Sequence, residues 1–189
     1  MNDDISIALK VVQILDRLEI PYLIGGSLAS STHGLARATA DADFLADLKR
    51  EQINDFVDAV KTDFYVSKES VTDAVKRRSS FNLVDYSSGF KVDIFIPRNR
   101  NFDLKQFSNR VLVAISPDDK AFFASAEDTI IAKLEWYRAG NEVSDRQWND
   151  IIGVIKVQGS KLNLEYMRDM AKDLGLSEFI ERAFEQAAD

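Results

Sequence analysis

The sequence predicts an α+β protein in which a mixed α and β core precedes a helical lobe. Short apolar segments of strand character alternate with helical spacing as far as about residue 120. From about residue 125 to the end, the apolar spacing is helical almost throughout. We therefore expect a core over residues 1–120 and a C-terminal α-helical lobe over residues 121–189, packed on the core.

The expected elements follow from apolar periodicity and from the residues that end each run. The strands are expected over 22–24, 41–47, 63–67, 81–86, 90–96 and 110–115. The helices are expected over 5–18, 27–33, 49–62, 102–107 and, as a helix or a loop, 68–77. Ser87-Ser88-Gly89 is typical of a hairpin turn, and glycines at 140, 159 and 175 interrupt the C-terminal helices.

The composition excludes several classes of protein and of site. The sequence has no cysteine, which removes disulfides and thiolate metal sites and fits a cytoplasmic location. No apolar run approaches the roughly 20 residues that cross a bilayer, and the acidic N-terminus is unlike a secretion signal. The net charge of −7 argues against a protein that binds nucleic acid non-specifically. With one histidine, any metal must be held mainly by oxygen, which favours Mg²⁺ or Mn²⁺ over zinc.

Three aspartates occupy expected strands, where aspartate is unfavourable. Asp41 and Asp43 alternate along one strand, so both side chains point to the same face, roughly 7 Å apart. Their charges repel unless that face is wet or holds a cation. Asp93 repeats the anomaly in the apolar strand 90–96. If the two strands are neighbours, the three carboxylates form an oxygen cage for one or two divalent ions.

A second group of residues is suited to an anion. Gly25 and Gly26 let a ligand approach the backbone closely, and the N–H groups at the following helix N-terminus favour phosphate. Ser27 adds a hydroxyl donor, while Arg37 and Thr39 lie just before the first aspartates and can contact phosphate oxygens. A Gly-Gly-Ser turn alone is an ordinary helix start, so the order and spacing of the whole set carry the prediction.

These residues resemble the signature of the DNA-polymerase-β-like nucleotidyltransferase superfamily. The matching segments are Gly25-Gly26-Ser27, His33-Gly34 and residues 37–43. The similarity is greatest to small prokaryotic members related to abortive-infection toxins and minimal nucleotidyltransferases. The resemblance implies a twisted mixed β-sheet flanked by helices, which binds a nucleoside triphosphate and two Mg²⁺ ions. Asp41, Asp43 and Asp93 would be the metal ligands, and Gly26 and Ser27 would hold the triphosphate.

The helical part is also similar to the toxin-like relatives. In those proteins a lysine and an aspartate approach the site, which makes Lys133 and Asp150 further candidates. One departure is Gln147, which stands where the relatives carry an aspartate. Two simpler interpretations compete: Lys133 as a surface lysine with a buried stem, and Asp150 as a solvated or salt-bridged helix residue. Three aromatic residues have two interpretations: Trp136, Tyr137 and Trp148 could pack between helices, or they could form a platform that binds the acceptor.

The sequence favours one function and leaves two alternatives open. The favoured function is transfer of a nucleotidyl group from a nucleoside triphosphate to a hydroxyl of RNA, of a protein or of a small molecule. The first alternative is a non-catalytic or complex-dependent nucleotide-binding component of a toxin–antitoxin pair, with an antitoxin protein as partner. The second is a phosphohydrolase that uses the same metals.

Overall fold

A computed structural model of the chain describes residues 3–188. Nine α-helices and seven strands lie in these residues, and two single-turn 3₁₀ segments, Arg50–Gln52 and Gly159–Lys161, accompany them. Within this range, no helix combines the length and the apolar character needed to cross a membrane. The predicted α+β class is confirmed.

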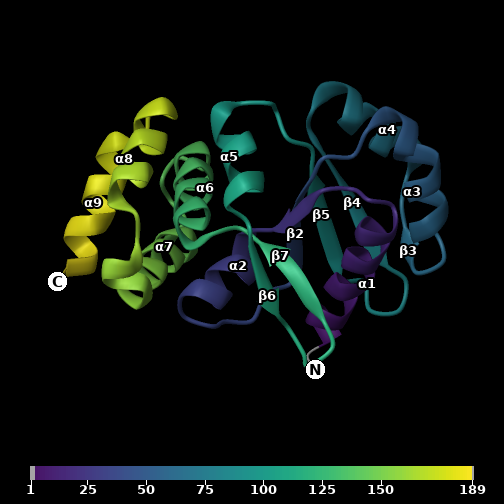
Figure 1. The fold of residues 1–189 in the computed structure, drawn as a ribbon, viewed down its shortest axis with the longest axis horizontal. Helices are drawn as coiled ribbons and strands as arrows, with labels where there is room; N and C mark the ends of the chain where they lie inside the picture. The colour runs from purple at the N-terminus through teal and green to yellow at the C-terminus, as the bar shows by residue number, and fades with distance from the viewer. Residues whose placement is uncertain (1–2, 189) are drawn as a thin grey trace. The chain divides into compact units, whose positions relative to one another are not determined.

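The strands form one mixed sheet with the order β3-β4-β5-β2-β1-β7-β6 (Figure 1). The strands are β1 (Tyr22–Ile24), β2 (Asp41–Ala46), β3 (Phe64–Tyr65), β4 (Ser80–Asp85), β5 (Lys91–Phe95), β6 (Val111–Ala114) and β7 (Lys120–Phe123). β2 is parallel to β5, and β1 is parallel to β7. The pairs β1–β2, β3–β4, β4–β5 and β6–β7 are antiparallel.

The chain folds into two compact units. The first contains the chain up to Gly25 together with Thr39–Phe123, and the second contains Gly26–Ala38 together with the chain from Ala124 onward. The chain therefore passes from one unit to the other three times, and each crossing is a single peptide bond.

The first unit consists of the sheet and four α-helices. The helices are α1 (Asp3–Arg17), α3 (Ile53–Val60), α4 (Lys68–Arg77) and α5 (Asn101–Asn109). α3 contacts both α1 and α4, and α4 also packs on β4. Phe44, Phe56 and Phe64 are among the largest fully buried side chains of this unit, and the ring of Phe56 meets Phe81 edge-on, with centroids 5.8 Å apart.

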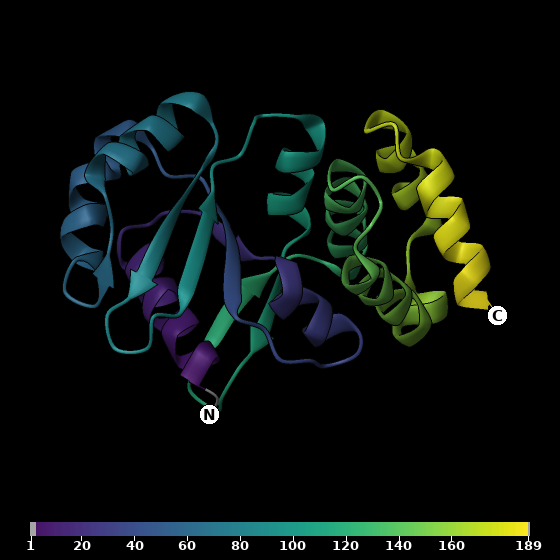
Figure 2. The same ribbon diagram turned by 180° about the vertical axis from the view of Figure 1, so that it is seen from behind.

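The second unit is a helical bundle. Its helices are α2 (Gly26–His33), α6 (Ala126–Ala139), α7 (Asp145–Gln158), α8 (Leu164–Asp173) and α9 (Ser177–Ala188), the last three drawn from green to yellow in Figure 2. Serine or asparagine side chains cap α6, α7 and α8 through Ser125, Ser144 and Asn163. Ile130, Ile131 and Leu134 of α6 are completely buried.

The division of the chain differs from the predicted boundary at residue 120 in two respects. Lys120–Phe123 is not part of the helical lobe but the strand β7, because its backbone pairs with β6 and β1. In addition, α2 belongs with the C-terminal helices, since it packs against α6 and α7. The approach is close at Gly34, where a Cβ atom would lie 2.9 Å from the backbone nitrogen of Val154.

Candidate active site

The strands β2 and β5 bring Asp41, Asp43 and Asp93 to one face of the sheet. The two strands are parallel neighbours in a register that places Asp43 beside Asp93. Along β2, the even-numbered residues are buried and the odd-numbered residues, including both aspartates, are partly exposed. Asp93 is partly exposed between the buried residues Val92 and Ile94. The assumed neighbourhood of the two strands is therefore confirmed.

Local donors hold two of these carboxylates. The hydroxyl of Thr39 donates to Asp41 Oδ1 at 3.0 Å and to the carbonyl oxygen of Asp41 at 3.1 Å. Asp93 Oδ2 forms an ion pair with Lys91 Nζ at 2.9 Å, and Asp93 Oδ1 accepts a hydrogen bond from the amide of Asn82 on β4. Thr39 thus orients a carboxylate in this structure, whereas the sequence predicts a phosphate contact for it.

Lys91 supplies positive charge to this face of the sheet. It lies opposite Asp41 in the register of β2 and β5. Its hydrogen bond to Asp93 raises the pKa of Lys91 most, burial opposes this, and the charges of Asp93, Asp41 and Asp43 raise it further. The ammonium group therefore experiences all three carboxylates.

The chemistry of the three aspartates fits a divalent cation, because carboxylates on one face of adjacent strands are the oxygen ligands that Mg²⁺ and Mn²⁺ prefer. The side-chain positions do not yet form such a cage. Among residues 3–188, no group of three or more acidic, histidine or cysteine side chains is arranged to hold a metal ion. Asp41, Asp43 and Asp93 would supply the ligands after a change of side-chain conformation.

The Gly25-Gly26-Ser27 segment joins the two units. Gly25 follows β1, and its N–H donates to the carbonyl oxygen of Asp43 at 2.8 Å. A Cβ atom at Gly25 would meet nothing within 4 Å, so the backbone there is open to a ligand. Gly26 begins α2 with a φ of +55°, which favours glycine. The predicted turn at the start of a helix is thus present.

A network of polar side chains surrounds Asp150 in the second unit. Arg37 binds this carboxylate with two parallel hydrogen bonds, from Nε to Oδ1 and from Nη2 to Oδ2, each 2.8 Å long. Arg37 Nη2 also donates to Ser27 Oγ at 2.5 Å. Lys133 Nζ lies 2.8 Å from Asp150 Oδ2 and donates to Gln147 Oε1 at 3.0 Å. Four of the predicted site residues therefore meet through direct contacts.

Burial distinguishes this network from surface ion pairs. The Lys133 side chain is 3% exposed and that of Asp150 is 7% exposed. The interpretation of Lys133 as a surface residue is therefore wrong. Burial alone would raise the pKa of Asp150, but the hydrogen bonds and charges of Arg37 and Lys133 outweigh it and lower that pKa.

Several other residues singled out in the sequence have structural partners. A ring nitrogen of His33 lies 2.7 Å from the carbonyl oxygen of Ala124. The rings of Tyr137 and Trp148 pack with centroids 5.1 Å apart, and Arg182 stacks on Trp148 at 4.3 Å. These contacts support the packing interpretation for Tyr137 and Trp148, whereas Trp136 is 55% exposed.

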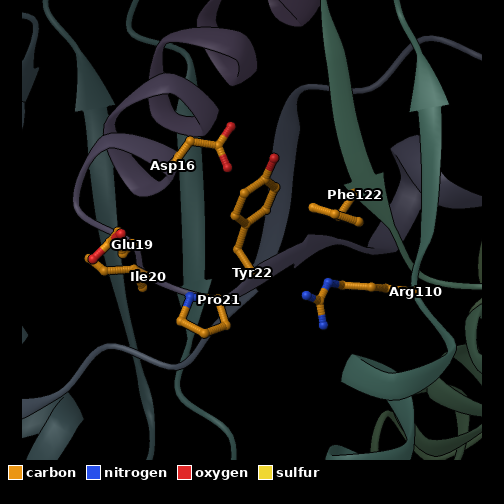
Figure 3. A pocket seen from close by; sticks show the side chains of 7 residues that line it. All are labelled: Asp16, Glu19, Ile20, Pro21, Tyr22, Arg110 and Phe122. Atoms are coloured by element: carbon orange, nitrogen blue, oxygen red, sulfur yellow. The ribbon is translucent and has the colours of Figure 1, made fainter.

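A shallow hollow of about 180 Å³ lies at the start of β1, where Ile20, Pro21 and Tyr22 line it. Figure 3 shows the Tyr22 side chain between Asp16 and Phe122, with Arg110 beside them. Burial raises the pKa of Tyr22 to about 12, and the negative charge of Asp16 adds to this effect. None of the predicted site residues lines this hollow.

Comparison with solved structures identifies the architecture. A nucleotidyltransferase-like protein from Paracoccidioides brasiliensis superposes with a TM-score of 0.57 at 18% identity, over 92% of this chain and 92% of its own. JHP933 from Helicobacter pylori gives 0.56 at 18% identity, over 90% of this chain and 72% of its own. The antibiotic-resistance factor ANT(2″)-Ia gives 0.55 at 12% identity, over 98% and 97%. The chain has the nucleotidyltransferase fold.

The solved structures confirm the nucleotidyltransferase fold that the sequence motif implies. No family model matches the sequence, and no curated protein is significantly similar to it. At 11–18% identity the likeness shows a shared fold, and the function of this chain rests on its own residues.

Three residues of this arrangement were not predicted as site residues. Lys91 and Asn82 contact Asp93, and Gln147 contacts Lys133. Lys91 had a usable signal: it precedes Asp93 by two residues in a strand, so both side chains point to the same face. Gln147 also had a signal, because it stands where the toxin-like relatives carry an aspartate. Asn82 reaches Asp93 only through the pairing of β4 with β5, and no local pattern in the sequence marks it.

Proposed function

We propose that the chain is a metal-dependent nucleotidyltransferase, which transfers a nucleoside monophosphate from a nucleoside triphosphate to an acceptor hydroxyl. The observation that carries the proposal is the register of β2 and β5. It aligns Asp43 with Asp93 and places Asp41 on the same partly exposed face, within a nucleotidyltransferase fold.

Residues of the first unit would hold the metal. Asp41, Asp43 and Asp93 would each contribute carboxylate oxygens to Mg²⁺ or Mn²⁺, and we propose two ions, as the resemblance implies. When bound, the ions would offset the negative charge that develops on the α-phosphate. Thr39 would keep Asp41 in position through the hydrogen bond at 3.0 Å.

Residues near the start of α2 and in α6 and α7 would contact the triphosphate. The backbone of Gly25 and Gly26 and the hydroxyl of Ser27 would donate to phosphate oxygens. Arg37 and Lys133 would add positive charge, and Asp150 would hold these two cations in fixed positions through its three hydrogen bonds.

The reaction follows from these roles. The acceptor oxygen attacks the α-phosphorus, the bond from this phosphorus to the bridging oxygen breaks, and pyrophosphate leaves. Asp93 would orient the acceptor hydroxyl and take up its proton. To do so, Asp93 must give up the ion pair with Lys91 or the hydrogen bond from Asn82.

A labelling experiment tests the proposal. The protein is incubated with each α-labelled nucleoside triphosphate, Mg²⁺ or Mn²⁺ and a set of acceptors, and label is sought on the acceptor. We expect transfer by the unmodified protein and loss of at least about a thousandfold in the double variant Asp41→Asn/Asp43→Asn. Asp47→Asn is the matched control, because Asp47 directly follows β2 and pairs with Lys49 on the surface.

The outcomes separate the candidate functions. Equal transfer by the double variant would contradict the proposal. Release of free phosphate without label on any acceptor would indicate a phosphohydrolase. Circular dichroism of both variants establishes that the fold is retained.

The acceptor is proposed to be a small molecule. Two proteins of the same fold have such ligands: ANT(2″)-Ia in complex with adenylyl-2″-tobramycin, and the lincosamide adenylyltransferase LnuA with lincomycin bound. The net charge of −7 also favours a small acceptor, because it would repel the many phosphates of a large RNA. Aminoglycosides and lincosamides should therefore be tested first, with RNA and cell-extract proteins as the other arms.

One observation favours a second function, that of a component that acts only in a complex. Both oxygens of Asp93 have donors within the first unit, and no ready metal cage exists in residues 3–188. A partner protein, such as the antitoxin of a paired system, would then have to change this arrangement. Label transfer that requires an added partner, encoded beside this chain, would support this alternative.

A further inference from the structure

We propose that Lys91 is a built-in counter-cation of the carboxylate face, which a divalent ion must displace in order to bind. Lys91 would thereby set the metal concentration at which the site fills. This inference rests on the proposed function, since it takes Asp41, Asp43 and Asp93 as the metal ligands.

The position of Lys91 carries the inference. It is the register partner of Asp41, and it precedes Asp93 by two residues on β5, so its side chain leaves the sheet on the carboxylate face. Lys91 Nζ lies 2.9 Å from Asp93 Oδ2. Asp41 and Asp43 lie on the same face of the neighbouring strand, as register partners of Lys91 and Asp93. One lysine thus lies on the face that carries all three carboxylates.

The oxygen that Lys91 holds is one that a metal would need. Asp93 Oδ1 accepts from the Asn82 amide, and Asp41 Oδ1 accepts from the Thr39 hydroxyl. A divalent ion that binds Asp93 through Oδ2 would have to replace the ammonium at this atom, because the two positive charges repel at such a distance. Metal binding through Asp93 Oδ2 and the Lys91–Asp93 ion pair therefore exclude one another.

The Lys91 ammonium group can leave its ion pair with Asp93 easily. Its side chain is 47% exposed, and its four rotatable bonds let the ammonium move into water at small cost. Asp93 is only 15% exposed and is fixed by the strand. An exposed lysine therefore competes with the metal without blocking it, and its removal should strengthen metal binding.

Mn²⁺ binding without nucleotide tests this inference. The full chain is titrated with Mn²⁺ while the free ion is followed by electron paramagnetic resonance. We expect Lys91→Met to bind Mn²⁺ about three- to tenfold more tightly, as loss of one partly screened charge at close range implies. Lys91→Arg keeps the charge and should bind like the unmodified protein.

Lys120→Met is the matched control, because Lys120 is an exposed lysine of β7 in the same unit. It removes the same charge from another part of the sheet and should leave the affinity unchanged. Lys91→Gln provides a second neutral variant in case the methionine variant fails to fold, which circular dichroism would reveal.

The outcomes separate the inference from the proposed function. Unchanged or weaker Mn²⁺ binding in both neutral Lys91 variants, with normal binding by the unmodified protein, overturns the role of Lys91 alone. Equal Mn²⁺ affinity of Asp41→Asn/Asp43→Asn and the unmodified protein overturns the metal site, and with it both proposals. Tighter binding in Lys91→Met that Asp41→Asn/Asp43→Asn abolishes supports both.

Discussion

Asp150 shows how a single buried carboxylate stabilises two cations. Arg37 and Lys133 both bind it at 2.8 Å, and two of the three side chains are less than a tenth exposed. Replacement by asparagine would leave both positive charges beside a neutral amide. We expect Asp150→Asn to lower the free energy of unfolding by about 3 kcal/mol.

Urea denaturation measures this change, and Asp169→Asn is the control, because Asp169 is exposed on α8. A loss for Asp150→Asn no larger than that of the control would contradict the stabilising role of the network.

Asp85 gives a prediction about pH. It is 1% exposed, and its Oδ2 accepts hydrogen bonds from Ser87 and Ser88 in the β4–β5 turn. Burial raises the pKa of Asp85, but these bonds and the charge of Lys10 outweigh it and lower the pKa to about 2. Because the pKa of Asp85 in the folded protein is below its ordinary value of 3.8, the ionised carboxylate stabilises the fold above pH 4.

This contribution should fall away between pH 4 and pH 2, and its full size is about 2 kcal/mol. Asp85→Asn should therefore be less stable than the unmodified protein at pH 7 and close to it at pH 2. Denaturation curves at several pH values measure the difference. Asp55→Asn, at an exposed position of α3, should show no such dependence on pH, and a constant difference for Asp85→Asn would refute the assignment.

Residue-scale contacts were predictable only where the local pattern determined them. Alternation along β2 placed Asp41 and Asp43 on one face from the sequence, whereas the position of Asp93 beside them depended on the pairing of β2 with β5, which the structure shows. The helical pattern of α6 could not distinguish a buried Lys133 from a surface lysine, because its partners Asp150 and Gln147 come from α7.

At the scale of elements, Gly34 fixes how α2 meets α7. A Cβ atom there would lie 2.9–3.0 Å from backbone atoms of Val154, Gly153 and Ser30, none of which can rotate away. We expect Gly34→Ala to lower the free energy of unfolding by about 2 kcal/mol. Gly153→Ala is the control on the same interface, since the atoms nearest to its Cβ atom would belong to the Leu35 side chain, at an ordinary contact distance of 3.5 Å.

Thermal and urea unfolding of the two glycine variants test this close approach. Gly153→Ala should be neutral or slightly stabilising, because alanine favours a helix interior. Equal stability of Gly34→Ala and Gly153→Ala would show that α2 can shift on α7 without cost.

Most elements were predictable because their periodicity is local. The hairpin of β4 and β5, the strand β2 and the four C-terminal helices all lie within a few residues of the predicted bounds. β7 was missed because its four residues, Lys-Ala-Phe-Phe, do not alternate, and only pairing with β6 and β1 defines the strand.

At the scale of the whole molecule, the units do not follow the order of the chain. α2 precedes the carboxylate strands in sequence yet packs on α6 and α7, an arrangement without a local sequence signal. We expect a fragment that ends at Phe123 to keep the sheet but to lose the order of residues 26–38. Hydrogen exchange should then show fast exchange in α2 and slow exchange in β2 and β5.

The full chain, in which α2 amides should be protected, is the control for this fragment. Slow exchange of residues 26–38 in the fragment would mean that α2 is stable without the C-terminal helices.

The bond between Arg37 and Asp150 joins positions that are 113 residues apart in the chain. This contact constrains how the sequences of the two segments can change, in addition to stabilising the fold. A recombination event that replaced the segment from Ala124 onward, while it kept Gly26–Ala38, would separate Arg37 from its carboxylate. We expect these two segments to be inherited together and to change in a correlated way among relatives.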